Sequence, residues 1–138
     1  MLFHYNFHGS VFAPGYNTAV EKTEVRMKKI IFAELLETIR EKWEPADIAF
    51  INDTALRVAK VDGAYDWHTH PAEDEFFLVL EGQIFIDTEA VGGAVKSVEL
   101  NRMEGFLVKQ GIKHRSRTDG PAWVLLVEPT RTNTKGVK

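Results

Sequence analysis

The sequence predicts an all-β protein, an antiparallel barrel or sandwich that follows an N-terminal arm and one short amphipathic helix. Eight or nine short runs of strand-forming residues occupy residues 48–127, and turn signals separate them. One run with helical periodicity precedes these strands. With 138 residues the chain has the length of a single domain, which is long enough to bury a core.

The first 26 residues are rich in aromatic side chains but show neither strand alternation nor helical periodicity. We therefore expect an irregular arm over residues 1–26 and a single folded domain over residues 27–138. Two interpretations of the arm remain open. Its aromatic residues pack against the barrel or a partner subunit, or it is an upstream extension of a domain that begins near Met27.

The helix is expected over about residues 30–43, because apolar residues recur there at steps of three and four and would lie on one face. Pro45 ends it, since proline disfavours helical dihedral angles in the residue before it. The apolar residues of this face are Phe32, Leu35, Leu36, Ile39 and Trp43.

After Pro45 the sequence has the pattern of strands separated by turns such as Asp62-Gly63 and Glu81-Gly82. Residues 76–80 are apolar at every position, so both faces of that strand need cover. A barrel core would cover one face and the helix, the arm or a partner subunit the other, which favours a homodimer. The expected strands are residues 48–51, 56–61, 66–70, 76–80, 84–87, 95–100, 106–108, 114–117 and 123–127.

The composition excludes several classes of protein. Cysteine is absent, so there is no disulfide framework, no thiolate nucleophile and no cysteine-type zinc site. The 17 basic and 20 acidic residues give a net charge of −3 without a dense Lys/Arg block, which argues against nucleic acid as a partner. No apolar stretch approaches the roughly 18 residues of a membrane span. No secretory signal is recognisable either, so we expect a cytoplasmic protein.

Four metal-binding residue types occur in an order that a β-barrel can gather into one site. His68 and His70 are two residues apart, so in a strand both imidazoles point to the same face. Glu75 opens the next strand and would complete a face of two histidines and one carboxylate. His114 begins a late strand and is a plausible fourth ligand. The adjacent Asp74 would face the other way, as a solvated turn residue.

Three neutral imidazoles and one carboxylate would leave a divalent ion with a net charge near +1. If the ion were six-coordinate, two positions would stay open for a bidentate anion or for water and a small molecule. Fe, Mn, Ni, Cu and Zn all suit these ligands, and ligand type alone does not choose among them. Ser116 and Thr118 share the parity of His114 and would line the cavity or bond to the backbone.

The segment from Gly63 to Gly82 resembles the first motif of the cupin superfamily, with a glycine, an HxH pair, four residues, a glutamate, six residues and a glycine. The distance from the first glycine to His68 is one residue short. The match includes His70 and Glu75, which are ligands in that motif.

Residues 103–118 resemble the second cupin motif more loosely. Gly111 and His114 occupy their expected places. Three positions depart from the motif: Met103 replaces the leading glycine, Lys109 the proline, and Thr118 the final asparagine. These positions affect turn geometry and contacts around the site, while the histidine ligand is kept.

The resemblance to small single-domain metal-binding cupins implies a six- to eight-stranded jelly-roll barrel over about residues 48–130. It implies a divalent transition metal inside one mouth, held by His68, His70, Glu75 and His114, and frequently a homodimer. We expect a metal-dependent enzyme of the dioxygenase or isomerase type that acts on a small oxygen-rich or anionic substrate. The alternative is a non-catalytic barrel that binds a small ligand or regulates, and a storage-type structural cupin is a weaker third interpretation.

Overall fold

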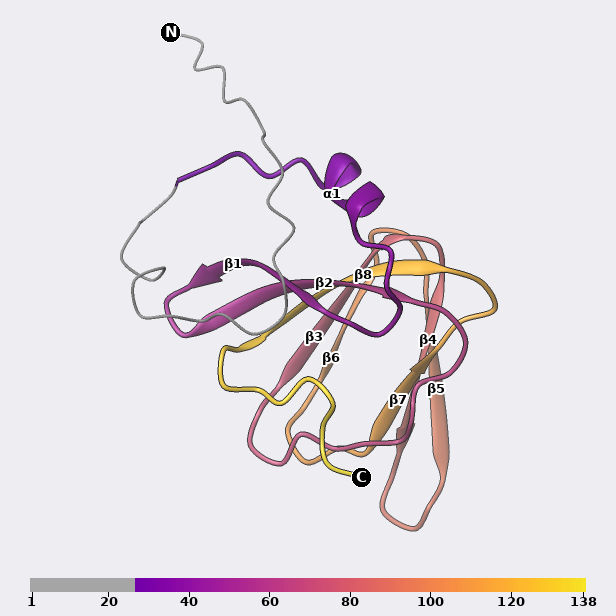
Figure 1. The fold of residues 1–138 in the computed structure, drawn as a ribbon. Coiled ribbons are helices and arrows are strands. Elements are labelled where there is room, and N and C mark those ends of the chain that lie inside the picture. The colour runs from indigo at the N-terminus through magenta and orange to yellow at the C-terminus, as the bar shows by residue number, and fades with distance from the viewer. Residues whose placement is uncertain (1–26) are drawn as a thin grey trace, which may run out of the picture. The chain divides into compact units, whose positions relative to one another are not determined.

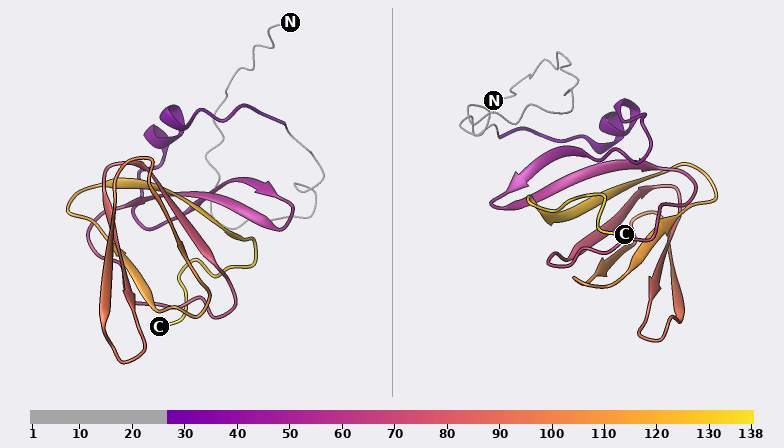
Figure 2. Two further views of the ribbon diagram at one scale, coloured as in Figure 1. Left: turned by 180° about the vertical axis from the view of Figure 1, so that it is seen from behind. Right: turned by 60° about the horizontal axis from the view of Figure 1, so that its bottom comes forward.

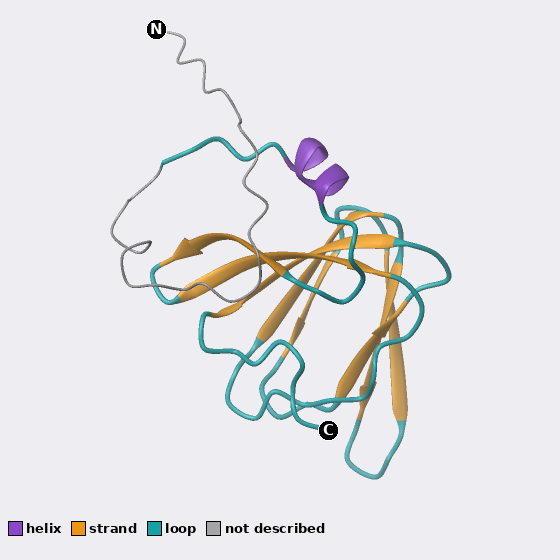
Figure 3. Ribbon diagram, viewed as in Figure 1, coloured by secondary structure: helices purple, strands orange, loops and turns teal. Residues whose placement is uncertain are grey.

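The computed structural model describes residues 27–138, and residues 1–26, which include the predicted arm, lie outside the described part of the chain. Figures 1 and 3 show that strands dominate the described residues. The elements are α1 (Phe32–Thr38), β1 (Ala46–Ile51), β2 (Thr54–Val61), β3 (Glu75–Glu81), β4 (Ile84–Glu89), β5 (Val95–Leu100), β6 (Gly105–Val108), β7 (His114–Arg117) and β8 (Ala122–Pro129).

The strands form two sheets, one with the order β1-β2-β8-β3-β6 and the other with the order β5-β4-β7. All paired strands run antiparallel. The two sheets face each other, as the views in Figure 2 show. The predicted all-β class and the antiparallel jelly-roll barrel are thereby confirmed.

The core lies between the sheets because apolar residues alternate along the central strands. In β3, Phe77 and Val79 point inward together with Glu75, while the residues between them are only half-buried. The register of the large sheet places Phe77 beside Leu126 and Val79 beside Val124. Burying these side chains against the small sheet supplies the main stabilisation of the barrel.

One predicted departure from the cupin motif has a visible structural consequence. Met103 adopts a φ of +67°, the left-handed conformation that glycine adopts without strain. Its amide donates to the carbonyl of Val79 at 2.7 Å, which holds the turn before β6 against β3. A methionine therefore adopts a positive φ at the position where the motif has a glycine.

The helix is shorter than predicted, ending at Thr38 and not near Trp43. Ile39 is already extended, and its carbonyl accepts a hydrogen bond from Trp123 Nε1 at 3.1 Å. Trp43 has a φ of +61° and its amide donates to the carbonyl of Lys60 at 2.9 Å. These hydrogen bonds to the barrel replace the last helical turn. The helix therefore ends before the apolar periodicity of the sequence does.

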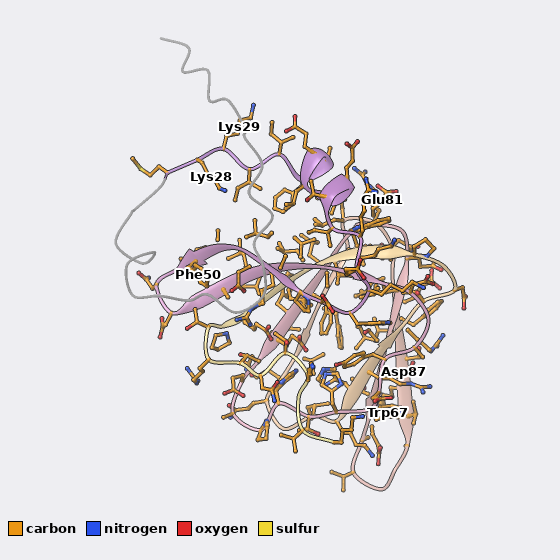
Figure 4. All side chains as sticks on the ribbon, viewed as in Figure 1. Lys28, Lys29, Phe50, Trp67, Glu81 and Asp87 are labelled. Carbon is orange, nitrogen blue, oxygen red and sulfur yellow. The ribbon has the colours of Figure 1, made fainter. Side chains whose placement is uncertain are left out.

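The segment 66–70 is not the regular strand that we expected. His68 makes an isolated bridge to His114, and Thr69 makes one to Val137. Trp67 points away from the two histidines, as predicted, and its ring lies 4.9 Å from the Arg115 guanidinium on the outside of β7. Arg115 also donates to Asp87 Oδ2 of β4 at 3.0 Å, and Figure 4 labels both Trp67 and Asp87.

The outer face of β3 is covered in part by α1. Phe32 and Leu36 of the helix and Leu78 and Leu80 of the strand line opposite sides of one apolar groove. The helix thus supplies some of the cover that the apolar strand requires. The homodimer stays a prediction.

Within residues 27–138 no helix has the length and hydropathy to span a bilayer.

Candidate metal centre

The structure brings the four predicted ligand residues together inside the barrel. His68 and His70 come from the loop before β3, Glu75 is the first residue of β3, and His114 is the first residue of β7. Each offers one ligand atom, and these atoms all lie within 4.8 Å of one another. All four side chains are buried.

Backbone carbonyls orient two of the imidazoles. His68 Nδ1 lies 2.8 Å from the carbonyl oxygen of Asp66, and His114 Nδ1 lies 2.9 Å from that of Ile112. A carbonyl can only accept, so each Nδ1 carries a proton, and in the neutral ring Nε2 keeps its lone pair for a metal. This arrangement is typical of histidines that bind metals, because it fixes both the tautomer and the ring orientation.

The electrostatics of the cluster keep its carboxylate ionised. Burial raises the pKa of Glu75, but the close His114 and His70 imidazoles outweigh burial and lower the pKa to about 2. His114 Nε2 lies 3.1 Å from Glu75 Oε2 and His70 Nε2 lies 3.4 Å from it. Burial lowers the pKa of His68, which favours the neutral imidazole that a metal requires.

The donor set fits a divalent transition metal ion. His70 Nε2 is buried and has no hydrogen-bond partner, although buried polar atoms normally have one. Imidazole nitrogens with one carboxylate oxygen suit Fe, Mn, Ni, Cu or Zn, and so much imidazole disfavours Mg and Ca. The cluster could therefore hold such an ion, and the ligand atoms do not identify which one.

A small cavity adjoins the cluster. It has a volume of about 40 Å³, and His68, Glu75 and Ser116 are among its lining residues. Trp43 and Tyr65 also line it, with ring centroids 5.0 Å apart. A molecule in this cavity would therefore lie directly beside two of the four candidate ligands.

Arg57 and Glu128 form a buried ion pair near the cluster, which the sequence did not reveal as a pair. Arg57 donates to Glu128 Oε1 at 2.6 Å and to Asp47 Oδ1 at 2.7 Å. Burial, followed by the negative charge of Glu75, raises the pKa of Glu128 to about 7, and Arg57 opposes the rise. The other carboxylate oxygen, Glu128 Oε2, is buried without a partner.

The C-terminal segment 132–138 also belongs to the site, and sequence reasoning missed it. Thr69 and Val137 exchange two backbone hydrogen bonds of 2.8 Å, and Thr134 lines the cavity. Gly136 has a φ of +64°, and a Cβ there would lie 2.9 Å from the Cβ of His68. In the sequence, Gly136 itself indicated this contact, because only glycine, which has no side chain, lets the backbone lie so close to His68.

Three further residues named in the sequence analysis, Lys109, Asp74 and Thr118, do not line the cavity. Lys109 pairs with Asp74 on the surface, and Asp74 also accepts from the amide of Gln110 at 2.9 Å. Asp74 is thus the solvated turn residue that we expected. Thr118 accepts from the amide of Gly63 at 3.0 Å, whereas Ser116 does line the cavity.

Comparisons with known proteins agree with this architecture. The model of the cupin domain matches residues 56–128. YdbB, an uncharacterized protein of Bacillus subtilis (strain 168), is 36% identical over 96 residues, which are 70% of this chain and 81% of that protein. A cupin-2 domain containing protein from Shewanella frigidimarina NCIMB 400 is 27% identical with a TM-score of 0.67, covering 72% of this chain and 93% of its own. Hydroquinone 1,2-dioxygenase from Sphingomonas sp. TTNP3 shares the fold at 20% identity with a TM-score of 0.56, over 65% of this chain and 67% of the enzyme. The chain therefore belongs to the cupin family.

Proposed function

We propose that this protein is a metal-dependent enzyme of the dioxygenase or isomerase type that acts on a small oxygen-rich or anionic substrate. The observation that supports the proposal is the convergence of four buried ligand atoms within 4.8 Å beside a cavity. In it, His68, His70, Glu75 and His114 hold one divalent transition metal ion. When bound, the ion would polarise a substrate oxygen or activate dioxygen.

The protein's own residues would prepare the site for this chemistry. The carbonyls of Asp66 and Ile112 hold two imidazoles in the ligating tautomer. Phe77 packs edge-on against His114, with ring centroids 6.2 Å apart, and so limits movement of that ligand. The apolar walls of the cavity limit the water that reaches the ligands.

The choice between oxidation and isomerisation stays open, because no residue of the site selects between them. The fold that the chain shares with hydroquinone 1,2-dioxygenase is compatible with oxygenase chemistry. The same fold can host many reactions, so it does not transfer that substrate or reaction to this chain.

The substitution His70→Ala tests the proposal. We expect it to abolish metal binding and turnover and to leave the barrel folded, because one lost imidazole removes a ligand but little of the apolar core. Thr69→Ala is a matched control, since Thr69 is the neighbouring residue and is not one of the four candidate ligands. Metal content is measured by elemental analysis and folding by circular dichroism. Full metal content in His70→Ala would contradict the proposal.

A second candidate is a barrel that binds a small ligand without turnover. One observation favours it: among the described residues that line the cavity, no carboxylate or imidazole remains for proton transfer beyond the proposed ligands. Only the hydroxyls of Tyr65, Ser116 and Thr134 remain. A substrate screen with the metal-loaded protein separates the candidates, because a non-catalytic barrel would bind ligands and release them unchanged.

The homodimer is likewise a proposal. The apolar groove between α1 and β3 leaves Leu78 and Leu80 only partly covered by the helix. Light scattering of the purified chain would measure the oligomeric state directly, and a monomer at micromolar concentration would contradict the dimer.

A further inference from the structure

The cavity beside the candidate metal centre is lined mostly by apolar side chains. Its polar lining side chains are His68, Glu75, the indole of Trp43 and the three hydroxyl residues Tyr65, Ser116 and Thr134, and the other lining side chains are apolar. Its volume of about 40 Å³ corresponds to roughly three water-sized groups. The apolar lining residues of the barrel interior are Ala59, Val61, Phe77, Ile84, Val124 and Leu126.

No lysine or arginine lines this cavity within the part of the chain that the structure describes. Three basic residues of the barrel region make other contacts. Arg57 bonds to Glu128 and Asp47, Lys109 pairs with Asp74, and Lys60 lies over the ring of Trp123 at 5.4 Å. A negative charge in the cavity would find no cationic side chain.

The charge of the loaded centre then limits what can bind. A divalent ion held by three neutral imidazoles and the ionised Glu75 carries a net charge near +1. One anionic oxygen group on the ion neutralises it. A second carboxylate on the same ligand would lie against apolar walls such as Phe77, Val124 and Leu126, where a buried unpaired charge is strongly unfavourable.

We propose that the cavity selects a small ligand with an oxygen-donor head and a compact apolar body, and that it rejects dianions. The head binds the metal, and the body of about three carbons lies against the apolar lining residues. This inference rests on the proposed metal site and narrows its substrate class to neutral or monoanionic compounds. It excludes dicarboxylates and other polyanions from the broader oxygen-rich or anionic class.

Two hydroxamates provide a matched test, because they share one metal-chelating head. In 3-methylbutanohydroxamate a CH₂ linker joins the head to an isopropyl group, whose three carbons form the apolar body. In malonomonohydroxamate a carboxylate replaces the isopropyl group. The tag-free protein is loaded with Co(II), and each hydroxamate is titrated while the visible absorption of the ion is followed. Each buried carbon contributes a factor of about four in affinity, so we expect the isopropyl compound to bind at least tenfold more tightly.

The outcomes separate the two claims. If the protein binds no Co(II), both the proposed function and the substrate class fail. If Co(II) binds and the carboxylate compound binds equally well or better, only the substrate class is overturned. Co(II) binding with the expected preference supports both.

A pair of valine substitutions then locates the apolar body. Val124→Thr places a hydroxyl in the wall of the cavity, whereas Val58→Thr makes the same change at an equally buried position outside the lining. We expect Val124→Thr to weaken binding of 3-methylbutanohydroxamate about fourfold and Val58→Thr to leave it unchanged. Both variants should retain Co(II) affinity. Equal effects of the two substitutions on hydroxamate binding would contradict the placement.

Discussion

Removing Arg57 should destabilise the barrel strongly, because it leaves a carboxylate buried without its partner. Glu128 is 1% exposed, and its hydrogen bond from Arg57 is 2.6 Å long. Breaking a buried ion pair from one side costs about 3–5 kcal/mol. Since both side chains are almost fully buried, solvent does not screen this pair. We therefore expect Arg57→Met to lower the free energy of unfolding by about 3–5 kcal/mol at pH 8.

The effect should depend on pH in a defined direction. The pKa of Glu128 in the folded protein is about 7, above its ordinary value of 4.5. Between pH 4.5 and about pH 7 Glu128 is therefore protonated in the folded state and ionised in the unfolded state. The contribution of Glu128 to stability is therefore greatest below pH 4.5 and is lost as the pH rises through about 7. Loss of Arg57 raises this pKa further, so the destabilisation should be smaller at pH 5 than at pH 8.

Urea unfolding of the metal-free protein, followed by tryptophan fluorescence, measures these differences. The double variant Arg57→Met/Glu128→Leu should be more stable than Arg57→Met alone, because no isolated charge remains. Arg102→Met is the control, since its pair with Glu81 is exposed and should contribute little. A loss below about 1 kcal/mol in Arg57→Met, or a double variant no more stable than the single one, would refute the reasoning.

Three further predictions concern the metal centre. Gly136→Ala should weaken metal binding and lower the melting temperature, because the added Cβ would clash with His68. Gly92→Ala is the control: Gly92 also has a positive φ but has open space around it, so this substitution should lower only the melting temperature, and equal metal affinity of the two variants in calorimetry would contradict the prediction. Metal should be released as the pH falls through roughly 6, because imidazoles must be neutral to ligate; unchanged occupancy at pH 4.5 in equilibrium dialysis would argue against a histidine site. Lys109→Ala should leave metal affinity unchanged, because Lys109 pairs with Asp74 on the surface; a clear change would show that this departure from the second cupin motif reaches the site.

The candidate ligands could be predicted because their information is local. His68 and His70 have a spacing that aims both side chains to one side, and the position of Glu75 at the start of a strand follows from the turn before it. Strand periodicity also predicted β7, with His114 as its first residue. The pairing of β7 with β4, which brings His114 into the barrel, follows from the jelly-roll order of the strands.

Contacts between distant segments could not be predicted from local patterns. Arg57 and Glu128 are 71 residues apart, and neither has a local feature that identifies the other as its partner. Trp43 continues the apolar pattern of the helix but instead packs against Tyr65, and both residues line the cavity. In each case a tertiary contact determines the position of the side chain, and the intrinsic preference of the segment does not reveal it.

The central claim is that His68, His70, Glu75 and His114 bind one transition metal ion. Elemental analysis of the protein purified without a histidine tag, beside the His68→Ala/His70→Ala variant, tests it most directly. We predict about one transition metal ion per chain in the unchanged protein and almost none in the folded variant. Equal metal content in the two proteins, or an unchanged protein that contains no metal and refuses added metal, would contradict the claim.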